Sequence, residues 1–228
     1  LVGFWVNRDW PSIRRDLSQR LDYSRLRVLF SDGGPGIEDN LLSPQMDQQR
    51  CIWHGKRDFS FLLYADQVKG KAQKPLLQLL DQNPLFQLQQ ADLEALSPAD
   101  EPLIRKLVKT IRRCFRDLLT ALPADRYPKT RTYVENFSRQ AMTFFDYWLD
   151  RQEWIPLTTN AIESSFSRVV NRIKRIGRRW SENGLMNWLA LAFRKILHPQ
   201  MWRVLWKQYL RLHRSLSLIF LRVEHTWI

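Results

Sequence analysis

The sequence predicts an α/β protein that is predominantly helical. In the first 58 residues, short apolar stretches alternate with helical patterns, which is typical of strands and helices in one α/β unit. After about Phe59, roughly a hundred residues carry helical patterns with no strand signal. The chain has 228 residues, of which 44% are hydrophobic and 26% charged, so it can bury a core as one domain or two.

Three short stretches near the N-terminus are expected to form strands. Residues 1–6, LVGFWV, are apolar and β-prone, and a helix is expected after them with Pro11 in its first turn. Residues 26–30, LRVLF, have the composition of a buried strand and lead into the glycine-rich residues 31–36. The third stretch is RCIWH at residues 50–54.

The remaining patterns predict helices. They cover residues 73–82, 100–122, 130–152, 185–197 and 201–216, with one more inside residues 157–180. In the second of these helices, apolar residues recur every three or four positions. They are expected to form one buried face made of Leu103, Leu107, Ile111, Phe115, Leu118 and Leu122.

Positive charge is concentrated in the final third of the chain. Lys and Arg outnumber Asp and Glu by 36 to 23, a net charge of +13. Residues 156–228 hold thirteen basic residues and three acidic ones, which accounts for +10 of that total. This segment is the expected contact surface for a polyanion, because clustered cations concentrate phosphate and release counterions on binding. The alternative is a solvated basic surface with no partner.

Cysteine usage and hydropathy indicate a cytoplasmic protein, associated with the nucleoid if DNA is its partner. Cys51 and Cys114 are the only cysteines, and no secretory signal is present, so a disulfide framework is not expected. No apolar run reaches transmembrane length, so no membrane partner is expected.

Asp32 stands at the end of a buried strand, directly before the glycine-rich turn. In open α/β sheets, catalytic groups collect at this edge, because the turns there face a crevice. The alternative is turn chemistry alone, since Asp-Gly is favoured in turns.

Glu163 lies near the start of a helix that becomes strongly basic, in LTTNAIESSFSRVVNRIKRIGRRW at residues 157–180. If Asn160 caps this helix, Glu163 is the acidic partner of a capping box and needs no other role. A helical wheel places Glu163 at the edge of the apolar arc, between core and surface. That arc contains Ile162, Phe166, Val169, Val170, Ile173 and Ile176.

Cys51 and His54 form a C-x-x-H motif, which is half of a zinc site. Two cysteines and four histidines do not supply a second pair at suitable spacing, which argues against zinc. We expect instead that Cys51 is buried in the third strand and that His54 marks the end of that strand.

Three stretches together resemble the mutator-type DDE transposases of bacterial insertion sequences. They are VLFSDGGPGI at residues 28–37, QQRCIWHGKRD at residues 48–58, and TTNAIESSFSRVVNRIKRIGRRWSENGLMNWLALAFRK at residues 158–195. By this resemblance, Asp32 is the second catalytic Asp and Glu163 the catalytic Glu. Cys51, His54 and Asn160 are supporting positions of the same motifs.

The resemblance implies a ribonuclease H-like core interrupted by an all-helical insertion. Residues 1–58 would form part of the core and residues 59–155 the insertion. Residues 156–200 would return to the core with the Glu163 helix, and residues 201–228 would form a basic C-terminal helix.

The implied activity is metal-dependent phosphoryl transfer, in which a DNA strand is cleaved and joined to another. In such sites, carboxylates hold two Mg²⁺ or Mn²⁺ ions about 3.5–4 Å apart, which activate the attacking oxygen and stabilise the leaving oxygen. Asp32 and Glu163 would be two of three such carboxylates, so we expect them to lie close together.

The resemblance also implies that the basic helix after Glu163 contacts the DNA backbone at transposon ends and target. The residues concerned are Arg168, Arg172, Lys174, Arg175, Arg178 and Arg179. Such phosphate contacts position DNA without reading its sequence. A homodimer acting on paired ends is expected.

The family's first catalytic Asp has no counterpart here, and Asp9 is not assigned to that role. The chain is therefore expected to be a fragment with an incomplete metal site that does not cleave DNA by itself. Two other functions stay open. One is a non-enzymatic helical DNA-binding remnant in which the acids are structural. The other is a ribonuclease H-like repair or recombination nuclease that cuts without strand transfer.

Overall fold

The computed structural model describes residue 5, residues 9–176 and residues 180–209, with the backbone alone at positions 161, 172, 175 and 176. Apart from Trp5, which is not in a strand, the strand expected at residues 1–6 lies outside the described residues. The chain divides into two compact units, and the larger spans Trp5–Glu163. The protein is 71% helix and 4% strand, which confirms a predominantly helical chain with a small sheet.

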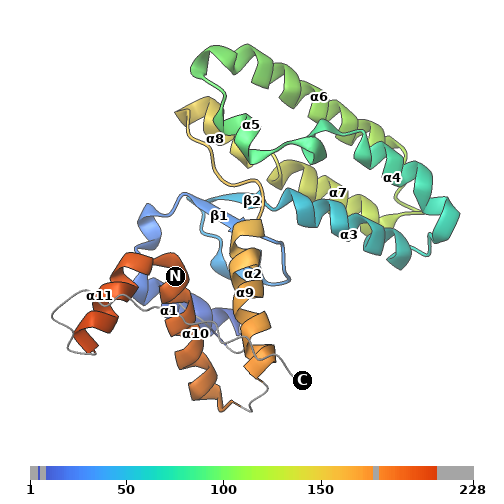
Figure 1. Ribbon diagram of the computed structural model, residues 1–228. Helices are drawn as coiled ribbons and strands as arrows, with labels where there is room; N and C mark the ends of the chain where they lie inside the picture. The colour runs from blue at the N-terminus through green and yellow to red at the C-terminus, as the bar shows by residue number, and fades with distance from the viewer. Residues whose placement is uncertain (1–4, 6–8, 177–179, 210–228) are drawn as a thin grey trace, which may run out of the picture. The chain divides into compact units, whose positions relative to one another are not determined.

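The sheet of the larger unit has two parallel strands, β1 (Val28–Ser31) and β2 (Asp47–Arg50), connected through α2 (Ile37–Leu41). Val28 pairs with Asp47 and Ser31 with Arg50. Because the strands are parallel, their carboxyl ends lie at the same edge (Figure 1). Asp32 and Cys51 follow the two strands at this edge.

The second strand lies earlier in the chain than the expected residues 50–54, and the prediction for Cys51 and His54 is wrong in this respect. Cys51 immediately precedes α3 (Ile52–Ala65), and His54 lies in the first turn of that helix. The strand consists of the polar residues DQQR. It can be buried because the amide of the fully buried Gln49 has hydrogen-bond partners within the protein. Its Nε2 donates to the Arg50 carbonyl at 2.7 Å, and its Oε1 accepts from the Phe144 N–H at 2.8 Å. An apolar pattern cannot reveal such a strand.

The N-terminal helix α1 (Trp10–Arg20) holds the loops around the sheet, and the short turn η1 (Tyr23–Arg25) links it to β1. The Trp10 indole donates to the Pro35 carbonyl at 3.0 Å. Arg14 donates to the Leu41 carbonyl and to the Ser43 hydroxyl, both at 2.7 Å. The glycine-rich loop after β1 is thus fixed at its far end.

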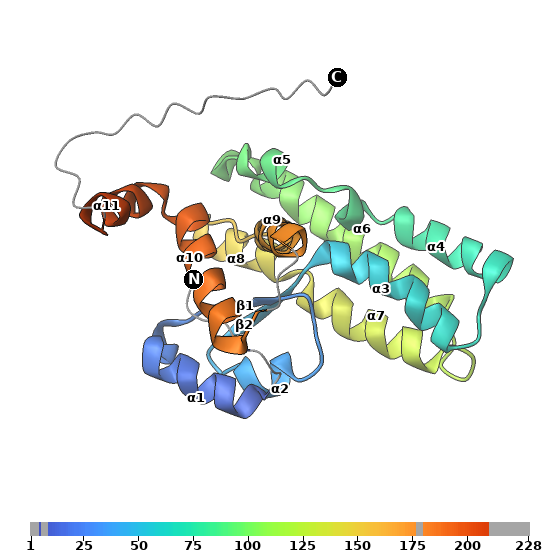
Figure 2. The ribbon, with the colours of Figure 1, turned by 60° about the horizontal axis from the view of Figure 1, so that its bottom comes forward.

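Helices make up the rest of the larger unit. They are α3, η2 (Gly70–Gln73), α4 (Lys74–Asp81), η3 (Pro84–Gln87), α5 (Gln90–Glu94), η4 (Pro98–Asp100), α6 (Glu101–Thr120), α7 (Pro128–Gln140) and α8 (Thr143–Arg151). Figures 1 and 2 show α3, α4, α6 and α7 running alongside one another, and α3 packs on α7 and α4 on α6. Helix α3 runs without a break across residue 58, so the helical region begins directly at the end of β2.

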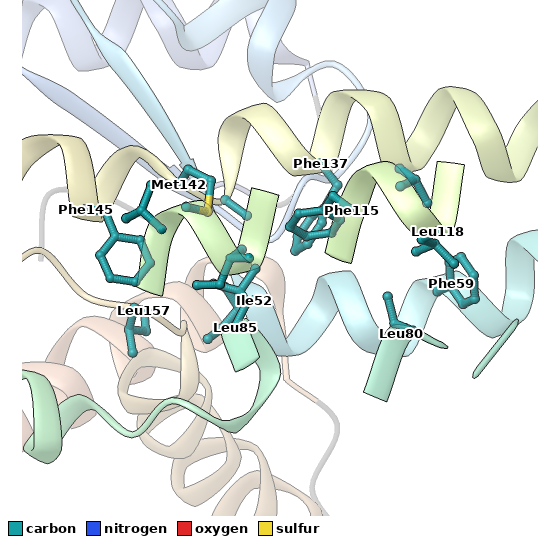
Figure 3. Close-up of a cluster of buried hydrophobic side chains, with 14 of the residues drawn as sticks. Ile52, Phe59, Leu80, Leu85, Phe115, Leu118, Phe137, Met142, Phe145 and Leu157 are labelled. Atoms are coloured by element: carbon teal, nitrogen blue, oxygen red, sulfur yellow. The ribbon is translucent and has the colours of Figure 1, made fainter. Parts of the chain in front are cut away.

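One hydrophobic cluster joins these helices to the sheet edge. Figure 3 shows Phe59 of α3, Phe115 of α6 and Phe137 of α7 in this cluster. Leu157, in the segment that leads to the last helices, is buried in the same cluster. The chain therefore returns to the β2–α3 junction after about a hundred residues of helix.

The buried face of α6 differs from the expected one. Ile104 and Val108 are buried, whereas Leu103 is 57% exposed. Residues four apart drift by about 40° at 100° per residue, so Leu103 lies roughly 120° from Phe115. The buried face is made of Ile104, Val108, Ile111, Phe115 and Leu118.

Residues 130–152, expected as one helix, form α7 and α8 with a break at Ala141 and Met142. The side chain of Gln49 lies at this break. It contacts the Ala141 carbonyl at 3.4 Å as well as the Phe144 N–H. A side chain from β2 therefore satisfies backbone groups that a continuous helix would have paired internally.

The smaller unit contains the later part of α9 (Asn160–Ile176), α10 (Glu182–Leu197) and α11 (Pro199–Tyr209). The rings of Phe166 and Phe193 are 4.8 Å apart, and Val169 is buried. Ile162 and other members of the expected apolar arc keep a large exposed fraction. In the described part of the chain, no helix is both long and apolar enough to cross a membrane.

Candidate functional site

The loop after β1 presents Asp32 to solvent. Its Oδ1 accepts a hydrogen bond from the Gly34 N–H at 3.0 Å. The φ angle of Gly33 is +83° and that of Gly36 is +79°, values that favour glycine. Asp32 therefore stabilises the turn, and its carboxylate remains exposed at the edge where both strands end.

Cys51 ties this edge to the segment before α9. Its N–H donates to the Ser31 carbonyl at 2.9 Å, and its side chain is fully buried. The Cys51 Sγ accepts the Thr159 N–H at 3.3 Å. The next residue, Ile52, donates its N–H to the Leu157 carbonyl at 3.1 Å. The segment that carries Glu163 is thus anchored to the β2–α3 junction by backbone contacts.

Glu163 contacts His54, which precedes it by 109 residues in the chain. The Glu163 Oε1 lies 3.6 Å from the His54 Nδ1, and the Thr159 hydroxyl contacts both atoms. That hydroxyl is 3.4 Å from the imidazole nitrogen and donates to the Glu163 Oε1. Since a hydroxyl carries one proton, its lone pairs are left to accept from His54.

His54 and Glu163 differ in their exposure to solvent. His54 is 5% exposed, whereas the Glu163 side chain is 46% exposed. Within the described residues, the contacts of Glu163 fall on Oε1, and Oε2 has no protein partner. One oxygen of Glu163 is therefore held by the protein, and the other can meet a ligand from solvent.

Thr159 is a site residue that the sequence reasoning missed. The Glu163 N–H donates to the Thr159 carbonyl at 3.0 Å, so Thr159 is the cap of α9 and Asn160 its first residue. The capping box expected between Asn160 and Glu163 is therefore not formed, because Asn160 is the first residue of the helix and Glu163 the fourth. The sequence indicates this role through the spacing in T-N-A-I-E, where a threonine hydroxyl precedes the glutamate by four residues.

The side chains that the resemblance singles out suit a hard cation only in part. Asp32 and Glu163 offer carboxylate oxygens, which Mg²⁺ prefers, whereas Cys51 and His54 are buried and softer. Across residues 5, 9–176 and 180–209, no three His, Cys, Asp or Glu side chains are grouped so that they could hold a metal ion.

The cations expected to contact DNA follow Glu163 along α9. Arg168 and Lys174 are exposed. Arg172 and Arg175 belong to the helix by their backbone, and their side chains lie outside the described structure. Arg178 and Arg179 lie outside the described residues.

A second polar cluster lies on the other side of the Asp32 loop. The Arg50 guanidinium packs against Gly33 so closely that a Cβ there would come within 1.8 Å of it. Arg50 also pairs with Glu38 at 3.1 Å. These residues line a cavity of about 320 Å³ together with Tyr133, whose pKa is raised by burial to about 12. The Asp32 loop is thus held by a buried cation.

Comparison with known proteins adds no relative: no protein-family model matches the chain, and no curated protein or solved structure is similar to it.

Proposed function

We propose that this chain carries part of the catalytic region of a DNA transposase of the mutator-type DDE group, built on a ribonuclease H-like core. The observation that supports this best is the contact between Glu163 and His54. The resemblance singles out both residues, although 108 residues lie between them. Cys51 joins them through Thr159, and its N–H meets the strand end that precedes Asp32.

In this proposal, Asp32 and Glu163 are metal ligands. Mg²⁺ or Mn²⁺ would neutralise charge on the scissile phosphate and lower the pKa of the attacking water or 3′-hydroxyl. Thr159 and His54 position Glu163 by holding its Oε1, which leaves Oε2 for the metal. Arg168 and Lys174, further along α9, hold the DNA backbone together with the other cations of that helix.

A second candidate is a DNA-binding protein without catalysis, which is favoured by the contacts of Glu163. The Thr159 hydroxyl already donates to the Glu163 Oε1, and His54 lies 3.6 Å from the same oxygen, as expected for a structural cap. In that case Asp32 stabilises its turn through Gly34 and binds no ion.

Iron-mediated cleavage of the polypeptide separates the two candidates. Fe²⁺ with ascorbate and peroxide replaces Mg²⁺ and cuts the chain near the bound ion. We expect cuts near residues 31–34 and 159–163, suppressed by excess Mg²⁺. Asp32→Asn and Glu163→Gln should each abolish both cuts, because both carboxylates bind the same metal cluster.

The matched controls are Asp125→Asn and Glu153→Gln, since both side chains are exposed and neither has an ion pair in the part of the chain described. These variants should keep both cuts. Cutting at one segment alone, or cutting that persists in Glu163→Gln, would favour the non-catalytic protein.

A further inference from the structure

Four basic side chains form one row along α6, a helix that the resemblance did not associate with DNA. They are separated by four, three and four residues and all are exposed: Arg105, Lys109, Arg112 and Arg116. At 100° per residue they fall within an arc of about 60°, and at 1.5 Å per residue they extend over about 16 Å of the helix. The positive charge is therefore presented in a line.

This row borders a groove between α6, α7 and α8 with a volume of about 870 Å³. Helix α6 packs on both α7 and α8 within the larger unit (Figure 1). Arg139 of α7 and Asp146 of α8 also line the groove, and Phe115 and Met142 form part of its apolar lining. The groove thus has five cationic side chains and one carboxylate.

Most of this positive charge is available to a ligand. In the described part of the chain, neither Lys109 nor Arg116 forms an ion pair with an acidic residue. Arg105 pairs with Glu101 at 2.7 Å and Arg112 with Asp146 at 3.5 Å, and both pairs are exposed. Exposed pairs contribute little to stability, and a phosphate can replace the carboxylate as the arginine's partner.

The pKa of the single carboxylate of the groove is shifted upward. Burial raises the pKa of Asp146 above its usual value, and the charges of Asp150 and Asp47 act in the same direction. Arg112 opposes the shift without cancelling it. The groove therefore sets one carboxylate against the cations of α6 and Arg139.

We propose that the α6–α8 groove binds the phosphate backbone of duplex DNA as a surface separate from α9. One strand of B-DNA presents a phosphate every 3.4 Å along the axis, so the row faces about five phosphates. The cations are held at fixed intervals by the helix, and the phosphates of a DNA strand are likewise evenly spaced. The contacts position DNA and carry no sequence preference. The proposal for this groove depends on the proposed function in one respect only, the identity of the partner as DNA.

The test compares two double variants of the whole chain with equal loss of charge. Lys109→Gln with Arg116→Gln removes two cations from the row. Lys106→Gln with Arg113→Gln removes two exposed cations from the same helix, which lie about 70–90° around its axis from the middle of the row. Glutamine is a good helix former, so both should fold, which circular dichroism will check.

Binding of a labelled duplex of about 20 base pairs is measured by fluorescence anisotropy at several salt concentrations. The row variant should bind at least about tenfold more weakly, and its slope of log affinity against log salt should fall by about 1.8. The control variant should lose less than about threefold. Asp146→Asn should strengthen binding, because it removes the negative charge that faces the phosphates.

Equal losses in the two double variants would overturn the proposal, because net charge alone would then explain binding. It would also be overturned if the row variant kept its DNA affinity and lost affinity for vesicles of phosphatidylserine and phosphatidylcholine. Iron-mediated cleavage at residues 31–34 and 159–163 reports on the metal site separately, so failure of one proposal does not imply failure of the other.

Discussion

At the scale of single residues, Thr159 joins the positions that the resemblance singled out. Its N–H contacts Cys51, its hydroxyl lies near His54, and the same hydroxyl donates to Glu163. A valine at this position has nearly the same shape and cannot make the hydroxyl contacts. Substitution of Thr159 therefore tests the contacts of the site and leaves the proposed metal ligands unchanged.

Thr159→Val should lower the free energy of unfolding by about 1 kcal/mol, since a hydrogen bond to a half-exposed carboxylate is lost. Urea unfolding followed by circular dichroism measures this value. Thr159→Ser keeps the hydroxyl and should restore most of the loss. Thr158→Val is the control, because its side chain has no hydrogen bond within the described residues, and it should change stability by less than about 0.5 kcal/mol. Equal effects of the two valine substitutions would contradict the linking role of Thr159.

At the scale of elements, helix α7 is capped by a residue far away in the sequence. Asp66, directly after α3, accepts hydrogen bonds from the N–H groups of Lys129 and Thr130 at 3.2 and 2.8 Å. The Thr130 hydroxyl donates to the same carboxylate at 2.7 Å. Burial acts to raise the pKa of Asp66, but the hydrogen bonds from Thr130 and Lys129 outweigh it, so this pKa lies below its usual value.

Asp66→Ala should destabilise the protein by about 1 kcal/mol at neutral pH, the usual contribution of a helix cap. Because the pKa is depressed in the folded state, the stabilisation is present above the unfolded pKa of about 3.9 and is lost as the pH falls through the folded value. Urea unfolding of wild type and variant near pH 7 and near pH 3 should therefore show a smaller difference at the acidic pH. A difference independent of pH would exclude an ionised cap.

At the scale of the larger unit, the side chain of Gln49 is one of the contacts that connect β2 to the helices. Gln49 is fully buried and bonds to backbone groups on both sides of the break between α7 and α8. Its neighbour Gln48 is also buried, and its Nε2 has no partner within the described residues. Two adjacent glutamines thus differ in whether their amides are satisfied.

Gln49→Leu should destabilise the protein by about 2–4 kcal/mol, since it leaves the Phe144 N–H and the Ala141 carbonyl buried without a partner. Gln48→Leu should be neutral or slightly stabilising, because it removes a buried donor that lacks a partner. Thermal unfolding of the two variants checks this pair. A larger loss from Gln48→Leu would show that the break between α7 and α8 does not depend on Gln49.

Local patterns in the sequence were enough to predict the helical class, a strand close to β1, and the positions of Asp32 and Glu163 at the start of a loop and of a helix. They failed where a structural role depends on partners distant in the sequence. β2 is a polar strand because Gln49 meets Ala141 and Phe144, and the cap of α9 is Thr159 because Cys51 and His54 lie beside it.

By itself, the sequence determined that the chain is predominantly helical and where positive charge accumulates, because periodicity and composition are local properties. The tertiary structure alone decided that Glu163 contacts His54 and that the cations of α6 border a groove with α7 and α8. Such contacts form between segments that pack together only when one buried core closes around them, and no local pattern records that pairing.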